Sequence, residues 1–306
     1  MGEDTPFSPL HKLGKVVIYD NTSSELVADR ISDADVVIVN KVKLTKQTLS
    51  DAKKLKLICT FATGYDNVDI NYCKASGIAV CNVPAYSTES VSLMTVSTVL
   101  ALKTGLFEYN EYVHSGEYTK SGVANKLTPV YHEISGLKWG IIGYGNIGRA
   151  VARVARALGA SVLYYQRTPV DDPEYADVDR ICRECDIITL HCPLNNESRG
   201  LIDESKIALM KNNVILVNEA RGAVVSEAAV ANAILEKRIA AFGCDVYSEE
   251  PFGQEHPYTR LLGMKNVILT PHAAWGSYEA RERCVLIICD NIKAFFDNKI
   301  LNRVEK

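Results

Sequence analysis

The stretch KWGIIGYGNIGRAVARVARALGA, residues 138–160, decides the fold. It opens with an apolar run typical of a buried strand, turns at a glycine-spaced motif, and continues with apolar residues at helical spacing. Such a motif alone is a weak signal, but a strand before it and a helix after it are the order that a dinucleotide-binding turn requires. We therefore predict a turn that holds the pyrophosphate of a dinucleotide, formed by Gly143, Gly145, Asn146, Ile147 and Gly148.

Strand-length apolar runs alternate with helix-length amphipathic runs on both sides of this stretch, a pattern that indicates βαβ units. The strands predicted before it are residues 15–20, 34–40, 55–62 and 77–83. Those predicted from it onward are residues 138–143, 161–166, 186–192, 213–219, 239–246 and 266–271. The predicted fold class is therefore α/β, with two doubly wound, parallel-sheet, Rossmann-like domains and a cleft between them.

The domain boundaries follow from two helical runs. One, from about Ser90 to Val113, separates the two sets of strands and is expected to cross between the domains. The other, residues 277–299, is amphipathic and follows the last strand, so we expect it to return to the N-terminal domain. We assign residues 1–96 and 277–306 to a flavodoxin-like substrate-binding domain, and residues 97–276 to the dinucleotide-binding Rossmann domain.

Composition excludes several classes of protein. A net charge of −3, from 34 basic and 37 acidic residues, lacks the basic footprint of a nucleic-acid binder. No run approaches the roughly 20 apolar residues of a membrane helix, and the N-terminus carries no targeting pattern, so we expect a cytoplasmic protein that binds neither nucleic acid nor membrane. Cys182 and Cys185 could form a metal half-site or a redox pair, but no second ligand pair lies at zinc spacing; we interpret both as structural and predict no metal.

The residues after the second strand of the dinucleotide domain bear on the choice of cofactor. NAD-binding domains place an acidic residue there, about 20 residues beyond the glycines, to bind the ribose hydroxyls. This chain has Gln166, Arg167 and Thr168 instead, so no carboxylate repels a 2′-phosphate and Arg167 with Thr168 can bind one. The sequence favours NADP(H) over NAD(H); if Arg167 is only a solvated loop residue, both cofactors are accepted.

Three further motifs follow predicted strands of the same domain. They supply a guanidinium from Arg221, a carboxylate from Glu250 and an imidazole from His272. Because the carboxyl ends of parallel strands meet at one edge, we expect these groups to lie together. Reduction of a 2-oxo acid leaves negative charge on oxygen, which a general acid neutralises, and an imidazole with an ordinary pKa of about 6.5 suits that task. A carboxylate would set its tautomer, and a guanidinium would grip the substrate carboxylate.

An ordered series of landmarks covers nearly the whole chain: residues 62–70, 77–91, 140–152, 191–194, 218–222, 243–251 and 270–275. With these motifs the chain resembles the D-isomer-specific 2-hydroxyacid dehydrogenase family, and most of all its glycerate dehydrogenase and hydroxypyruvate reductase branch. The resemblance implies hydride transfer from NAD(P)H to hydroxypyruvate or glyoxylate, giving D-glycerate or glycolate. It also implies that His272 is the acid–base, that Glu250 pairs with it, and that Arg221 binds substrate.

The resemblance implies further contacts. The additional cofactor-binding residues would be His191, Cys192, Pro193, Glu219, Ala220, Asp245 and Thr95. The substrate would also be bound by Thr63, Gly64, Tyr65 and Lys41, although Lys41 fits a solvated strand end equally well. It further implies a homodimer joined through the cofactor domains, with residues 113–135 reaching the partner. Because the chain stops at Lys306, we expect no regulatory domain.

Two departures from the family pattern concern the substrate. The helix after Val91 reads Ser92-Leu93-Met94-Thr95, and Glu219 adds a carboxylate next to the catalytic arginine. Two alternatives remain open: a non-catalytic NAD(H)-sensing protein of the same fold, and a phosphite- or formate-type dehydrogenase. Formate enzymes of this superfamily have a glutamine in place of Glu250, which argues against that activity. The physiological substrate, the direction of reaction and the oligomeric state stay undetermined at this stage.

Overall fold

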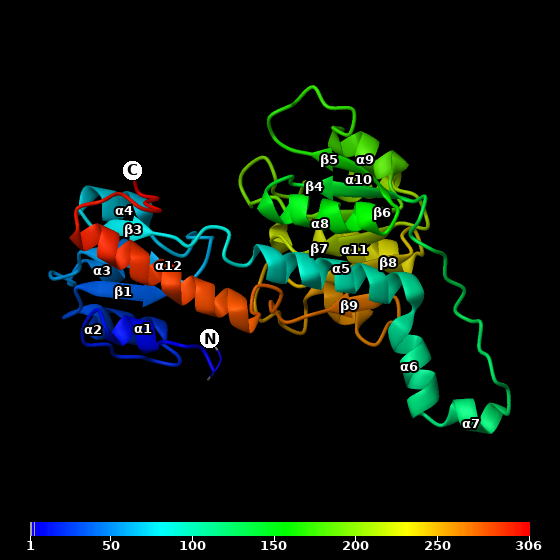
Figure 1. Cartoon of the computed structure of the whole chain (residues 1–306), viewed down its shortest axis with the longest axis horizontal. Coiled ribbons are helices and arrows are strands. Elements are labelled where there is room, and N and C mark those ends of the chain that lie inside the picture. The colour runs from blue at the N-terminus through cyan, green and yellow to red at the C-terminus, as the bar shows by residue number, and fades with distance from the viewer. Residues whose placement is uncertain (1, 3) are drawn as a thin grey trace. The chain divides into compact units, whose positions relative to one another are not determined.

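The computed structural model describes residue 2 and residues 4–306. Met1 and Glu3, which belong to the stretch predicted to carry no targeting pattern, lie outside the described residues. The chain forms two compact units (Figure 1). The small unit comprises residues 1–87 and 276–306, and the large unit comprises residues 88–275. The predicted boundary between residues 96 and 97 therefore differs from the observed one. Helix α5 (Thr88–Thr104) packs on α8 (Asn146–Ala157) and on strands of the large unit, so it belongs to that unit.

The large unit is built on six parallel strands. They are β4 (Lys138–Ile142), β5 (Ser161–Tyr165), β6 (Ile187–Leu190), β7 (Ile215–Asn218), β8 (Ala241–Cys244) and β9 (Val267–Leu269). The spatial order is β5-β4-β6-β7-β8-β9, so the chain reverses its direction across the sheet at β4. This reversal confirms the predicted doubly wound sheet and places a topological switch point beside the glycine motif.

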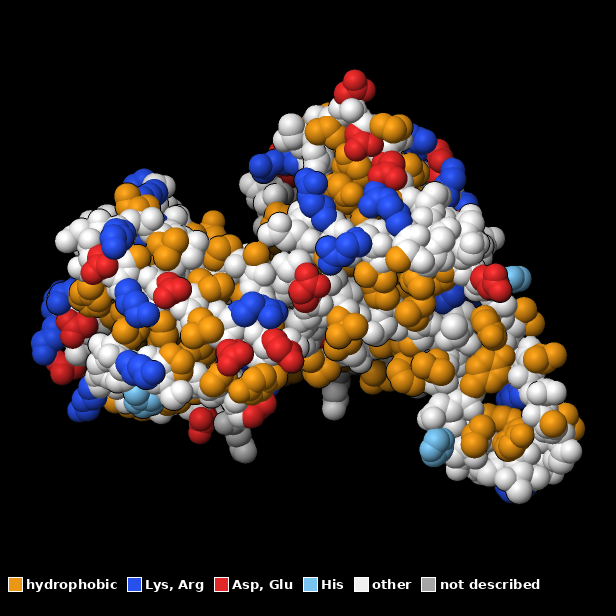
Figure 2. All heavy atoms as spheres, viewed as in Figure 1, with side chains coloured by type: hydrophobic (Ala, Val, Ile, Leu, Met, Phe, Trp, Pro, Cys, Tyr) orange, Lys and Arg blue, Asp and Glu red, His pale blue; other side chains and the backbone are white. Residues whose placement is uncertain are grey.

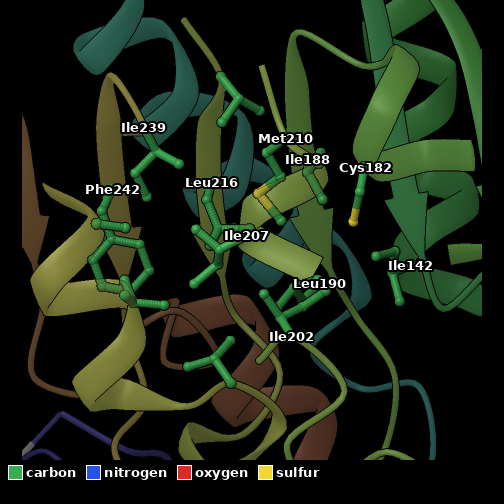
Figure 3. Close-up of a cluster of buried hydrophobic side chains, with 14 of the residues drawn as sticks. Ile142, Cys182, Ile188, Leu190, Ile202, Ile207, Met210, Leu216, Ile239 and Phe242 are labelled. Atoms are coloured by element: carbon green, nitrogen blue, oxygen red, sulfur yellow. The ribbon is translucent and has the colours of Figure 1, made fainter. Parts of the chain in front are cut away.

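Two hydrophobic clusters cover the two faces of this sheet. Ile187 and Ile188 are neighbours on β6 and both are fully buried, yet they belong to different clusters because successive side chains of a strand point to opposite faces. One cluster includes α5 and α8 (Asn146–Ala157). The other, drawn in Figure 3, includes α9 (Val178–Glu184), α10 (Glu204–Leu209) and α11 (Glu227–Leu235).

The long helix predicted from about Ser90 to Val113 is broken in the structure. Gly105 has a φ of 66°, a left-handed conformation that ends α5 and starts α6 (Leu106–His114). Both helices belong to the large unit, so the expected crossing between domains is wrong. Among the described residues no single helix is long and apolar enough to cross a membrane; α5 and α6 pass that test only as a pair, bent by 65°.

In the described part of the small unit, three parallel strands lie in chain order, β1 (Val36–Val39), β2 (Leu57–Thr60) and β3 (Ala79–Cys81). The strand predicted at residues 15–20 does not form. Val17, Ile18 and Tyr19 are 61%, 52% and 49% exposed, so this apolar run has no buried face to hold it in the sheet. The parallel α/β class is confirmed, although this sheet lacks the reversal of a doubly wound order.

The α-helices among the described residues of the small unit are α1 (Ser8–His11), α2 (Val27–Ile31), α3 (Lys46–Leu49), α4 (Ile70–Ala75) and α12 (Tyr278–Phe296). The expected return of the last helix is confirmed, because α12 packs on α1 and β2. The chain end then lies along β3, where Arg303 pairs with Cys81 and the Val80 amide donates to the Glu305 carboxylate at 2.9 Å.

Cys182 and Cys185 have a structural environment. Both are fully buried, and burial raises the pKa of each thiol to about 12. A Cβ built on Gly140 would lie 2.9 Å from the Cys185 sulfur, so this thiol packs directly on β4. Thiols that stay protonated and sealed in a core are poor metal ligands and poor nucleophiles.

Candidate active site

The three motif glycines between β4 and α8 differ in their surroundings. Gly143 has a φ of 103°, and a Cβ there would lie 2.4 Å from the Cys192 amide nitrogen. A Cβ on Gly148 would lie 2.2 Å from the Gly143 carbonyl oxygen, whereas one on Gly145 would meet no atom within 4 Å. The first and third glycines are therefore required by packing, and the second faces open space in which an anion can approach the backbone.

Helix α8 begins at this open position. The first hydrogen bond of the helix runs from the Arg149 amide to the Gly145 carbonyl at 2.9 Å. The amides of Asn146, Ile147 and Gly148 precede it and have no acceptor within the helix, which gives the helix start its affinity for anions. This turn fits the pyrophosphate of a dinucleotide by its shape and by its donors.

A second feature of the predicted cofactor site lies at the end of β6. The two ring nitrogens of His191 are buried and have no hydrogen-bond partner among the described residues. Burial lowers the pKa of this imidazole to about 3, so the ring is neutral. Burial also raises the pKa of the adjoining Cys192 thiol to about 11, and Pro193 is exposed. An unsatisfied imidazole beside the glycine turn is the kind of group that a bound ligand satisfies.

The residues expected to read the ribose follow β5. The Gln166 side chain donates to the Thr168 carbonyl at 3.1 Å and closes this short loop. Arg167 and Thr168 are exposed. The loop therefore presents a cation and a hydroxyl at the strand end, as the sequence predicts.

The predicted acid–base pair is assembled in the structure. His272 Nδ1 lies 2.7 Å from Glu250 Oε2, and the Tyr247 amide donates to Glu250 Oε1 at 3.0 Å. The side chains of His272 and Glu250 are 22% and 24% exposed, so both are partly shielded yet reachable. Because Nδ1 is held by the carboxylate, Nε2 points away from Glu250, as an acid–base imidazole requires.

Asp245 organises the turn that carries His272. The histidine has a φ of 53°, a conformation that costs a residue with a side chain roughly 1–2 kcal/mol. Asp245 accepts hydrogen bonds from the Thr270 hydroxyl at 2.6 Å and from the amides of Ala273 and Ala274 at 2.8 and 2.9 Å. These bonds span His272 and hold it in place. The sequence predicts Asp245 only as a cofactor ligand, and this positioning role depends on contacts between separate strands.

Arg221 lies on a turn that packs against the Glu250 loop. Its Nη1 donates to the Ala220 carbonyl at 2.8 Å, and Asn218 braces the turn by donating to the Arg221 carbonyl at 3.0 Å. A Cβ on Gly222 would lie 2.0 Å from the Tyr247 carbonyl carbon, so the two loops touch backbone to backbone. The structure thus brings the loops of Arg221, Glu250 and His272 to one edge of the sheet.

Glu227 was missed at the sequence level. Its carboxylate accepts from the Ser248 amide at 2.8 Å and contacts His256 Nε2 at 3.0 Å, and so clamps the loop that carries Glu250. Nothing in the sequence marks it, because Glu227 lies in the first turn of α11, where an acidic residue is ordinary.

Two of the predicted cofactor residues have surroundings that the sequence does not reveal. Thr95 is fully buried within α5, and its hydroxyl donates to the Val91 carbonyl at 2.8 Å. The contact of Thr95 with the cofactor stays a prediction. Glu219 is buried at the end of β7, next to the buried Ala220, in an environment described below.

The predicted substrate residues of the small unit lie on two loops that are tied together. Thr63 donates to the Val83 carbonyl at 2.9 Å, and Asn67 donates to the Asn40 and Val42 carbonyls at 3.1 and 2.8 Å. These bonds fix the loop that carries Thr63, Gly64 and Tyr65 beside the loop that carries Lys41. Thr63, Tyr65 and Lys41 are exposed.

The NAD-binding domain of the D-isomer specific 2-hydroxyacid dehydrogenases matches residues 96–274. The chain belongs to this family. Its nicotinamide-cofactor class is thereby confirmed, and the match spans the glycine turn and the His272 loop.

Individual relatives of this family match the chain over most of its length. A hydroxypyruvate reductase of Blautia hydrogenotrophica is 35% identical over 99% of this chain and 96% of its own. A glyoxylate reductase of Thermococcus litoralis is 38% identical over 88% of this chain and 82% of its own. The crystal structure of the D-lactate dehydrogenase of Aquifex aeolicus, complexed with NAD and lactic acid, has a TM-score of 0.87 and 31% identity, covering 99% of this chain and 97% of that one.

Proposed function

We propose that this dehydrogenase uses NAD(P)H to reduce small 2-oxo acids to D-2-hydroxy acids, with hydroxypyruvate and glyoxylate as the first candidates. The observation that carries the proposal is the His272–Glu250 pair at 2.7 Å, held beside the Arg221 turn in a dinucleotide-binding unit. The names of the hydroxypyruvate and glyoxylate reductases among its relatives support this choice of substrates.

The reduced nicotinamide, when bound, supplies the hydride. His272 donates a proton from Nε2 to the carbonyl oxygen as negative charge develops there, a contribution of about 10²–10⁴ in rate. Glu250 stabilises the protonated ring through Nδ1 before the transfer, and Arg221 binds the substrate carboxylate and polarises the carbonyl. In the opposite direction His272 accepts the proton of the hydroxyl group.

In this proposal the small unit also binds the substrate. We assign the capture of the substrate carboxylate to the loop of Thr63, Gly64 and Tyr65, with Lys41 contributing charge from the loop to which it is tied. Backbone amides of a braced loop are suited to this, because they bind an anion without the entropy cost of ordering a flexible side chain.

The purified protein tests the proposal directly. Mixed with NADPH or NADH and a panel of 2-oxo acids, it should consume the reduced cofactor, as followed by absorbance, fastest with hydroxypyruvate or glyoxylate. A panel that includes phosphite and formate with the oxidised cofactors covers the alternative dehydrogenases. Absence of turnover with every 2-oxo acid would overturn the proposal.

We further propose a preference for NADP(H), supported by the exposed Arg167 and Thr168 after β5. Replacing Arg167 by alanine should raise the Michaelis constant for NADPH about 10- to 100-fold and leave that for NADH nearly unchanged, since a charge-assisted hydrogen bond contributes about 1.5–3 kcal/mol. Steady-state kinetics with both cofactors measure this. Arg238→Ala, which removes a cation from the amino-end edge of the sheet, should affect neither constant; an equal loss for both cofactors in Arg167→Ala would contradict the preference.

The predicted homodimer has a candidate surface on the large unit. Apolar side chains are exposed along α6, α7 (Glu117–Ser121) and the segment that returns to β4, where Figure 2 shows hydrophobic groups gathered. The exposed residues are Leu106, Phe107, Val113, Tyr118, Val123, Leu127, Val130 and Tyr131. Such a concentration is typical of a protein interface, and we propose that a second copy covers it.

The double variant Leu127→Glu, Val130→Glu tests this surface. The two side chains are 81% and 74% exposed, so charges there should leave the fold of one subunit intact and separate the subunits. Light scattering after gel filtration should show a dimer for the unmodified protein and a monomer for the variant. Leu262→Glu, at a site 62% exposed elsewhere on the large unit, should remain a dimer.

A further inference from the structure

Glu219 is a buried carboxyl group that the proposed reaction does not use. It follows β7 directly, is 8% exposed, and neither of its carboxyl oxygens has a hydrogen-bond partner among the described residues. A carboxylate in such surroundings lacks the donors that would replace water around its charge. The group is therefore stable in the neutral, protonated form and unstable as an isolated anion.

Its nearest charged neighbour strengthens this effect. β7 and β8 pair with Asn218 opposite Cys244, which places Glu219 and Asp245 side by side where the two strands end. Asp245 accepts hydrogen bonds from Thr270, Ala273 and Ala274. Burial, and then the charge of Asp245, raise the pKa of Glu219 to about 9. Glu219 is therefore protonated at neutral pH.

The other titratable groups that interact with Glu219 come from β8 and the loop after it. They are the Cys244 thiol and the Tyr247 hydroxyl, and burial raises the pKa of both. Neither acquires charge near neutral pH. On its own turn, Arg221 directs Nη1 to the Ala220 carbonyl. Glu219 therefore lies beside the negative charge of Asp245. A positive charge bound next to Glu219 would stabilise its anionic form.

The position of Glu219 in the sheet indicates which part of the cofactor it meets. The pyrophosphate turn follows β4 and the ribose-reading loop follows β5, so the adenosine half belongs to that side of the switch point. The nicotinamide half is then directed to the ends of β7, β8 and β9, where Glu219, Asp245 and His272 lie. The oxidised nicotinamide ring carries a positive charge and the reduced ring is neutral.

We propose that Glu219 is a proton-linked discriminator of the cofactor's oxidation state: it stays protonated with the reduced form and releases its proton to solvent when the cationic oxidised form binds. The inference rests on the proposed function. No bond other than the O–H bond of Glu219 breaks, and the proton passes to water. As a result, acid should favour the reduced cofactor over the oxidised one, which suits an enzyme that works as a reductase.

Calorimetry of cofactor binding tests the linkage without any turnover. At about pH 8, titrations in phosphate and in Tris, whose ionisation enthalpies differ, give the number of protons released. Binding of the oxidised cofactor, NADP⁺ or NAD⁺, should release most of one proton, and binding of its reduced form almost none. As the pH rises from about 7 to 9, the dissociation constant of the oxidised form should fall by up to tenfold for each pH unit, and that of the reduced form should not change.

Variants separate Glu219 from the other groups. Glu219→Gln, which has the shape of the neutral acid, should abolish the proton release and the pH dependence while it still binds the reduced cofactor. His272→Gln and the exposed-site control Glu249→Gln should both keep the release. If Glu219→Gln does not fold, Glu219→Thr provides the same comparison with a smaller neutral side chain.

Three results would overturn the inference. Equal proton release with the two redox forms would do so, as would release that persists in Glu219→Gln; either leaves the proposed reductase activity standing. Failure of every nicotinamide cofactor to bind would overturn the inference together with the proposed function. The calorimetric result and the turnover assay thus distinguish the two failures.

Discussion

His272→Gln should lower kcat for 2-oxo acid reduction by about 10²–10⁴, with little change in cofactor affinity. Glutamine keeps a polar side chain near Glu250 but cannot donate and accept a proton at neutral pH. The imidazole is 22% exposed and contacts Glu250 in the large unit, so its loss leaves no large cavity and the fold should persist. Stopped-flow or steady-state kinetics, together with fluorescence titration of NADPH, measure the two effects separately.

Glu250→Gln provides the matched comparison for this prediction. It keeps a side-chain amide oxygen able to accept the Tyr247 amide, yet it removes the negative charge that stabilises the protonated imidazole. Its loss in kcat should be smaller than that of His272→Gln. A protein that only senses the nicotinamide cofactor should have no turnover to lose, and unchanged turnover in His272→Gln would show that this histidine is not the acid–base.

Gly148→Ala should destabilise the large unit and weaken cofactor binding. The new methyl group would lie 2.2 Å from the Gly143 carbonyl oxygen and 3.0 Å from an Ile141 methyl carbon, distances at which the α8 helix must move away from β4. Overpacking of this kind costs about 1–3 kcal/mol and more when the contact is backbone. Urea denaturation, followed by circular dichroism, should give a lower free energy of unfolding.

Gly145→Ala, at the second glycine of the same motif, is the control for that variant. Its φ of −83° suits alanine and its Cβ would meet no atom within 4 Å, so stability should change by less than about 1 kcal/mol. The methyl group would nevertheless occupy the space left for the pyrophosphate, and affinity for NAD(H) and NADP(H) should fall at least tenfold. Equal cofactor affinity in Gly145→Ala and the unmodified protein would contradict the proposed position of the pyrophosphate.

Several features were predictable from the sequence because they depend on local pattern. Apolar runs such as residues 138–143 and 186–192 form strands since their side chains are buried on both faces of a parallel sheet. The glycine turn was equally accessible, because close approach of the backbone and a positive φ restrict Gly143 and Gly148 to glycine wherever this turn occurs. The proximity of Glu250 and His272 was expected because strand ends share an edge, and the family resemblance implied that the two side chains pair.

Other features depend on neighbours that are distant in the sequence. Residues 15–20 have the composition of a strand, but a strand also needs a partner and a buried face, and these side chains remain exposed. Gly105 breaks a helical pattern that is otherwise continuous, because its left-handed conformation is set by the chain on either side. The units divide after residue 87, and not after residue 96 as predicted, because α5 packs on the large sheet.

The same distinction holds within the site. The fold class and the dinucleotide-binding class of the large unit were predictable from the sequence, since residue type at short spacing specifies both; the roles of His272 and Glu250 stay a prediction. The tertiary structure alone shows that Asp245 holds the His272 turn, that Glu227 holds the Glu250 loop, and that Glu219 is buried beside Asp245. Burial and hydrogen bonding between separate strands set those roles, and a carboxylate in a linear sequence carries no mark of either.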